Sequence, residues 1–250
     1  MNMTELLLIL IGFAASFVGT ISGSGGLIGM PSMLLVGIPI HHVIATAKFS
    51  NIFSSFSSFY TLLRQRELTW SQVWPLIPFA LFGGLSGGLL ANSFSETTMN
   101  IAAIILLLSA FIISFTKKPK SRDGENFLLP KKAYPSLLGI SVYDGMFGPG
   151  QATLLMYTFL NNGASYLKAL AFTRFQTFIS CAAAFSTYLL AGNFDWRLAI
   201  YYAIGSLAGS QLAIRAARHI SPRQLKLILH AVTIALICQL IYRVISQNIS

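Results

Sequence analysis

The sequence predicts an all-α polytopic membrane protein made of two homologous repeats. Of its 250 residues, 54% are hydrophobic and 10% are charged, and the mean hydropathy is +0.68. This leaves too little charge to cover the surface of a soluble domain. The apolar residues form eight long segments, and glycine-rich stretches interrupt the first and the fifth of them. Together these observations predict paired bundles of membrane helices with broken helices at matching positions.

Most of the eight segments are close to the roughly 20 residues that a membrane-spanning helix needs. In chain order they cover residues 6–35, 43–63, 70–91, 99–115, 135–160, 167–190, 196–217 and 225–245. The first five residues lack the basic stretch of a secretory signal peptide, so we expect the N-terminus to be retained.

The first segment contains residues 19–31, which read G-T-I-S-G-S-G-G-L-I-G-M-P. Its glycines loosen a helix and Pro31 removes a backbone donor, so we expect the helix to break here. Residues 145–157, G-M-F-G-P-G-Q-A-T-L-L-M-Y, predict a second break. Broken backbone in a bilayer occurs where protein or a water-filled cavity satisfies its polar groups, so paired breaks point to a transporter's binding site. Re-entrant half-helices and one kinked helix followed by a loop both fit such a run.

The two halves match at a fixed offset of 126 residues without a gap. Gly19 then pairs with Gly145, and Trp70 pairs with Trp196. Matched glycines and tryptophans in one register indicate a duplication. We therefore expect a first transmembrane repeat at residues 1–116, a basic cytoplasmic linker with six cations at 117–134, and a second transmembrane repeat at 135–250.

The orientation of the repeats depends on whether the first and fifth segments cross the membrane. If they do, the copies are parallel and the cationic loop at 215–226 lies outside, against the positive-inside rule. If they are re-entrant, each copy has three spans and the copies are inverted. Nearly all loop cations then lie inside, with Arg197 and Arg243 left outside. We therefore favour the inverted arrangement.

Lys48 and Arg174 occupy the same repeat position within apolar segments. A lone cation there costs about 2.5 to 3.5 kcal/mol on insertion scales, so a role in binding is expected. With the polar residues within helical reach of each, the two cations predict an anion site; these are Thr46, Ser50 and Asn51 near Lys48, and Thr173, Gln176 and Thr177 near Arg174. The alternative, in which the charge reaches the nearer interface, fits Lys48 better than Arg174.

Helix N-termini at the breaks would add free N–H groups and a positive dipole end to this site. The alternative role for these small residues is close helix packing. The candidates are Thr20, Ser22, Ser24 and Gly25 in the first unit, and Gly148, Gly150, Gln151 and Thr153 in the second.

Asp144 is the acidic residue that lies inside the apolar segments away from their ends. It could bind a coupling proton or sodium ion, or it could be a fixed counter-ion to Arg174 or Lys48.

Several function classes are not favoured. The net charge of +10 lies mostly in short loops, where membrane topology explains it, so we expect no nucleic-acid partner. Cys181 and Cys238 lack C-x-x-C spacing, and His41 and His42 lack a third ligand, so we expect no metal site or other cofactor. Neither a P-loop nor a catalytic motif is present, so we expect neither ATP use nor an enzyme.

The glycine-rich breaks and the duplicated A-K-F and T-R-F segments make the chain similar to the sulfite exporter TauE/SafE family of bacterial transporters. Units of that family open on a glycine-rich stretch followed by a proline and then by a helix of small residues. The first unit matches both features, with G-T-I-S-G-S-G-G-L-I-G-M-P followed by V-I-A-T-A. The second unit departs from this pattern at Pro149, Gln151 and Ala152. The resemblance implies transport of small sulfur-containing anions such as sulfite or organosulfonates.

We therefore expect a multi-pass protein of the bacterial inner membrane that moves a small anion by alternating access. The partners expected are the lipid bilayer, the anionic substrate and a coupling proton or sodium ion, and a homodimer is allowed. The alternative is a non-transporting membrane protein that assists assembly of a partner.

Overall fold

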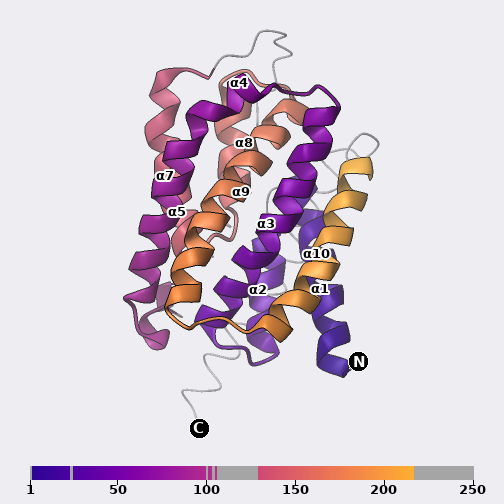
Figure 1. The fold of residues 1–250 in the computed structure, drawn as a ribbon, viewed down its shortest axis with the longest axis vertical. Helices are drawn as coiled ribbons and strands as arrows, with labels where there is room; N and C mark the ends of the chain where they lie inside the picture. Colours follow the sequence, from indigo (N-terminus) through magenta and orange to yellow (C-terminus); the bar gives the residue numbers. More distant parts are fainter. Residues whose placement is uncertain (1, 23–24, 100, 103–104, 106–128, 217–250) are drawn as a thin grey trace.

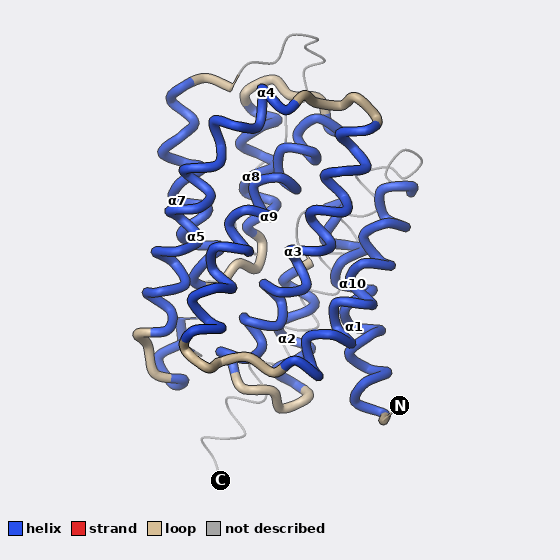
Figure 2. Tube along the Cα trace, viewed as in Figure 1, coloured by secondary structure: helices blue, strands red, loops and turns tan. Residues whose placement is uncertain are grey.

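The computed structural model describes residues 2–22, 25–99, 101–102, 105 and 129–216, and every regular element in these ranges is a helix (Figure 1, Figure 2). Most of the segment predicted at 99–115, the linker residues 117–128 and the segment at 225–245 lie outside the described residues. The α-helices are α1 (Met3–Ser22), α2 (Gly26–Leu35), α3 (Ile40–Arg64), α4 (Trp70–Val73), α5 (Ile77–Asn92), α7 (Tyr134–Met146), α8 (Gln151–Asn161), α9 (Tyr166–Leu190) and α10 (Trp196–Ala216), and the short 3₁₀ helices are η1 (Trp74–Leu76) and η2 (Lys131–Ala133).

Among the residues that the structure describes, two stretches are long and apolar enough to cross a bilayer on length and composition, Met3–Ile21 with 19 residues and Trp70–Asn92 with 23 residues. Helices α3 and α9 have 25 residues each, but they are less apolar. The reason is that they carry polar side chains such as Lys48, Ser50 and Arg174, which are buried between helices. Polar residues of membrane helices characteristically face the bundle interior in this way.

Both predicted helix breaks are present. Helix α1 ends at Ser22 and α2 begins at Gly26, while α7 ends at Met146 and α8 begins at Gln151. Pro31 is the sixth residue of α2, so the glycines and not the proline mark the first break. In the second break Gly150 has a φ of 81°, a left-handed conformation that glycine adopts without strain.

The long helices follow one another across the bundle in the order α7, α5, α9, α3, α10 and α1. Helix α2 packs on α1 and α3, and α8 packs on α7 and α9. Figure 1 shows α3 and α9 side by side at the centre, running in opposite directions. The two short helices that follow the breaks therefore both lie against the central pair.

Small residues allow the outer helices to approach closely. A Cβ atom on Gly205 or Gly209 of α10 would collide with the backbone of α1, and a Cβ on Gly83 or Gly87 of α5 would collide with that of α7. Close backbone contact through glycine is a main source of stability between helices in lipid, where apolar burial drives association little. These contacts fix α1 and α7, and hence the breaks that follow them.

Candidate functional site

The two helix breaks meet inside the bundle. A Cβ atom on Gly26, the first residue of α2, would lie 2.8 Å from the Cα atom of Pro149 in the second break. The hydroxyl of Tyr143 donates to the carbonyl oxygen of Pro149 at 2.5 Å, and the hydroxyl of Tyr166 donates to that of Ile21 at 2.5 Å. Tyrosines thus satisfy backbone groups that the interrupted helices leave open.

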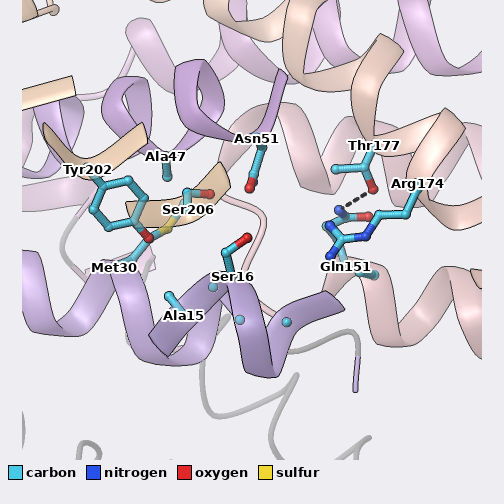
Figure 3. A pocket seen from close by; sticks show the side chains of 14 residues that line it. Ala15, Ser16, Met30, Ala47, Asn51, Gln151, Arg174, Thr177, Tyr202 and Ser206 are labelled. Carbon is cyan, nitrogen blue, oxygen red and sulfur yellow. Dashed lines mark hydrogen bonds between the residues drawn. The ribbon is translucent and has the colours of Figure 1, made fainter. Parts of the chain in front are cut away.

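A cavity of about 50 Å³ lies at this meeting point, between α1, α2, α3, α8, α9 and α10 (Figure 3). Since one water needs roughly 10 to 15 Å³ of such space, the cavity has room for a few waters or one small solute. Figure 3 shows Asn51 and Ser16 facing each other across it. The polar side chains in its wall include Ser16, Asn51, Gln151, Arg174, Thr177 and Ser206.

Arg174 brings a positive charge to the cavity. It is the ninth of the 25 residues of α9, and 5% of its surface is exposed. Its Nη1 donates to the Ser55 hydroxyl at 3.4 Å, and its Nη2 donates to the Thr20 hydroxyl. Within the described part of the chain no carboxylate forms an ion pair with this guanidinium. A buried cation without a counter-charge strongly favours an anion beside it.

Gln151 presents an amide to the same space. Its Nε2 donates to the Thr177 hydroxyl at 2.9 Å, and its Oε1 has no hydrogen-bond partner in the structure although the residue is 6% exposed. Rotating the amide by 180° would exchange these two atoms and let Thr177 donate instead. Either end of the amide can therefore serve a ligand in the cavity.

The N-termini of two helices open on the cavity. Gly25 and Gly26 precede and begin α2, Gln151 and Ala152 begin α8, and all four line the cavity. The first N–H groups of a helix have no acceptor within the helix, and its dipole is positive at this end. Both features attract an anion.

Lys48 does not line the cavity, because its side chain forms an ion pair with Asp144. The Lys48 ammonium lies 2.7 Å from Oδ1 of Asp144 and also donates to its backbone carbonyl. The Ser180 hydroxyl donates to Oδ2, and the Cys181 thiol lies 3.5 Å from it. Of the two counter-ion alternatives left open by the sequence, the structure brings Asp144 together with Lys48 and not with Arg174.

The glycines of the second break make room for this ion pair. Gly148 has a φ of 104°, and a Cβ atom there would lie 2.7 Å from the Lys48 ammonium and 2.9 Å from Oδ1 of Asp144. Gly148 therefore has two reasons to be glycine, its left-handed backbone and the close approach of the pair.

The predicted site residues thus fall into separate groups. Gly25, Asn51, Gln151 and Arg174 line the cavity, while Lys48, Asp144 and Gly148 form its neighbouring ion pair and break. Gly150 caps the start of α8. Ser22 is the last residue of α1, and Ser24 lies outside the described residues.

Gln176 is not among the residues of the cavity wall. Its Nε2 donates to the Leu137 carbonyl and to the Ser141 hydroxyl of α7, each at 3.0 Å, so its amide joins α9 to α7.

Three residues of the cavity wall were not predicted from the sequence, namely Ser16, Tyr202 and Ser206. Tyr202 and Ser206 lie four residues apart on α10, a polar pair on one helix face that could have identified them.

Comparison with known proteins finds one transporter family and several relatives that are named as membrane transporters. The family described as "Sulfite exporter TauE/SafE" matches residues 8–240. The "Probable membrane transporter protein ORF9" of Sinorhizobium sp is 31% identical over 236 residues, which cover 92% of this chain and 89% of that protein. A "Probable membrane transporter protein" of Haemophilus influenzae is 29% identical over 219 residues, 84% and 85% of the two chains. The "Probable membrane transporter protein YfcA" of Escherichia coli K12 is 22% identical, with coverage of 83% and 78%. No solved structure matches significantly.

Proposed function

Because the chain belongs to the sulfite exporter TauE/SafE family of membrane transporters, we propose that it is a secondary transporter for a small anion, sulfite or an organosulfonate. The protein would then act in the inner membrane as a multi-pass protein and not as an enzyme. The observation that carries this proposal is the buried Arg174 guanidinium in the wall of a cavity where two helix breaks meet. Its charge has hydroxyl partners and lacks a counter-ion among the described residues, so a bound anion would complete it.

The arrangement of matching helices supports two opposed repeats. Helices α3 and α9 begin 126 residues apart and end 126 residues apart, and they run in opposite directions (Figure 1). Helix α1 packs on α10 of the other half, and α7 packs on α5 of the other half. In each half, the helix before the break thus packs on a helix of the other half. Such reciprocal packing is expected when inverted repeats surround one central site.

The distribution of cations supports a membrane orientation. Figure 1 places the end of α3, the start of α9 and the end of α10 at one end of the bundle. These helix ends carry Arg64, Lys168 and Arg215, whereas Arg197 lies at the start of α10, at the opposite end. By the positive-inside rule the end of the bundle that carries Arg64, Lys168 and Arg215 would face the cytoplasm. Helix α1 would then begin on the outer side.

In the proposed mechanism the two halves expose the cavity to one side of the membrane at a time. Arg174, Asn51 and Gln151 hold the anion, with the start of α8 beside its charge. The Lys48–Asp144 ion pair joins α3 of the first half to α7 of the second. A proton or sodium ion taken up by Asp144 would weaken this pair and so couple ion movement to the change of access.

Purified protein in liposomes tests the proposal. We expect uptake of radiolabelled sulfite or of a small organosulfonate, with saturation at high concentration and dependence on a proton or sodium gradient. Folded protein that moves none of these anions would favour the alternative, a non-transporting protein that assists assembly of a membrane partner.

A further inference from the structure

The buried side-chain charges around the cavity sum to one positive charge. Lys48 and Arg174 are the buried cations in this part of the described chain, and Asp144 is the buried acid. The 2.7 Å ion pair neutralises Lys48 with Asp144, and its two side chains are 1% and 2% exposed. The remaining buried charge at the cavity is therefore one, the guanidinium of Arg174. An occupant with a single negative charge would neutralise this remaining side-chain charge.

An occupant with two negative charges would leave one of them without compensation. The free energy needed to remove an ion from water grows with the square of its charge, so it quadruples from a monoanion to a dianion. Attraction to the Arg174 charge and to the positive N-terminal ends of α2 and α8 only doubles. The site therefore penalises dianions relative to monoanions of the same size and shape.

The wall of the cavity differs between its two ends. Figure 3 shows Gln151, Thr177 and Arg174 together at one end, and Met30, Ala47 and Tyr202 at the other. The first end offers charge and hydrogen-bond donors, and the second offers methyl groups, a thioether and an aromatic ring beside the hydroxyls of Tyr202 and Ser206. At roughly 10 to 15 Å³ for each water, the 50 Å³ between them fits about three to five non-hydrogen atoms.

We infer that the cavity selects singly charged anions that carry a short uncharged substituent, and that it discriminates against dianions of equal size. The anionic head lies at Arg174, Gln151 and Thr177, and the substituent lies against Met30 and Ala47. This inference rests on the proposed function as an anion transporter and narrows its substrate class. Sulfite, which exists in both charge states near neutral pH, would be taken in its singly charged form.

Three tetrahedral compounds of nearly equal size isolate charge from shape. Dimethyl sulfone is neutral, methanesulfonate carries one negative charge, and sulfate carries two. Binding to the purified full-length protein is measured by calorimetry at neutral pH and constant ionic strength. We expect methanesulfonate to bind at least about tenfold more tightly than sulfate or dimethyl sulfone. Sulfate binding as tight as methanesulfonate would overturn the inference.

Substitution of the ion pair tests the charge balance itself. In Asp144→Asn, Lys48 loses its counter-charge, so the ratio of methanesulfonate to sulfate affinity should fall by about tenfold or reverse. The double variant Lys48→Met with Asp144→Asn is neutral again and should keep the wild-type ratio, whatever its absolute affinity. If Asp144→Asn does not fold, the ratio of methanesulfonate to sulfate affinity in the wild type decides the matter. A folded Asp144→Asn protein with an unchanged ratio would contradict the charge argument.

The outcomes separate this inference from the proposed function. Flux of sulfite in liposomes with no preference between methanesulfonate and sulfate would refute the charge selection and leave the transporter intact. Absence of flux for every anion would refute the transporter. Flux of sulfite that rises as the pH falls, at constant total sulfite and without a proton gradient, would support uptake of the singly charged form.

Discussion

Lys48 and Asp144, which lie 96 residues apart in the sequence, form a buried ion pair with 2.7 Å between Nζ and Oδ1. The pair joins α3 to the end of α7, next to the second helix break. It accounts for the charge of Lys48 and leaves Arg174, its counterpart in the second half, with hydroxyl partners and a cavity beside it. Two cations at equivalent positions thus have different surroundings.

Replacing Arg174 with alanine should abolish anion flux. Loss of a hydrogen bond to a charged group costs about 1.5 to 3 kcal/mol, and loss of the charge itself weakens anion binding further, so we expect affinity to fall by at least about tenfold. Flux in liposomes measures the effect, and size-exclusion chromatography shows whether the protein is folded. Lys168→Ala, which removes a cation from the first turn of the same helix, is the matched control. Wild-type flux in Arg174→Ala would remove this residue from the site.

Breaking the ion pair from one side should destabilise the protein strongly. Lys48→Met leaves Asp144 buried without a counter-charge, which costs about 3 to 5 kcal/mol, whereas the double variant Lys48→Met with Asp144→Asn should recover much of that loss. The melting temperature in detergent is measured for Lys48→Met, for Asp144→Asn and for the double variant. Equal destabilisation by the single and the double variants would show that the two residues do not interact.

Asp144→Asn should also change the coupling of transport. If Asp144 binds the coupling ion, flux in this variant should lose its dependence on the proton or sodium gradient while downhill exchange of anion continues. Flux is measured with each gradient imposed separately. A gradient dependence equal to that of the wild type would exclude Asp144 as the coupling group and leave it as a counter-ion.

The contact between the two helix breaks gives a steric prediction. Gly26→Ala introduces a Cβ atom 2.8 Å from the Cα atom of Pro149, so the breaks must move apart. Overpacking of this kind costs about 1 to 3 kcal/mol, and we expect a lower melting temperature and weaker anion binding. Gly139→Ala in α7 is the control, because a Cβ there meets nothing within 4 Å. Equal melting temperatures and affinities for the two variants would contradict the described contact.

Part of this structure could be predicted from local sequence. Glycines loosen a helix wherever they cluster, so both breaks were predicted where they occur, and Trp70 and Trp196 were predicted to open the helices that they begin. Pro31 was a poorer guide. A helix can accept a proline at the cost of one hydrogen bond, and the helix containing Pro31 continues to Leu35.

The detailed site could not be predicted, because it depends on how helices face one another. Asp144 was within reach of either cation in principle, and the rotation of α7 relative to α3 and α9 selects Lys48. Gln176 lies two residues after Arg174, and residues with that spacing do not share a helix face. Thr177, three residues after Arg174, does share its face and lines the cavity with it. Helix geometry could have favoured Thr177 over Gln176 from the sequence.

The most direct test of an anion site at the meeting of the breaks is protection of a cysteine in the cavity wall. Ser16→Cys is made in a protein that lacks Cys181 and Cys238, and its reaction with a water-soluble thiol reagent is timed with and without a transported anion. Leu190→Cys, at a position that is 88% exposed, is the control. We predict that saturating anion slows labelling at residue 16 but not at residue 190, and that Arg174→Gln removes the protection. Equal labelling rates at residue 16 with and without the anion would contradict the account.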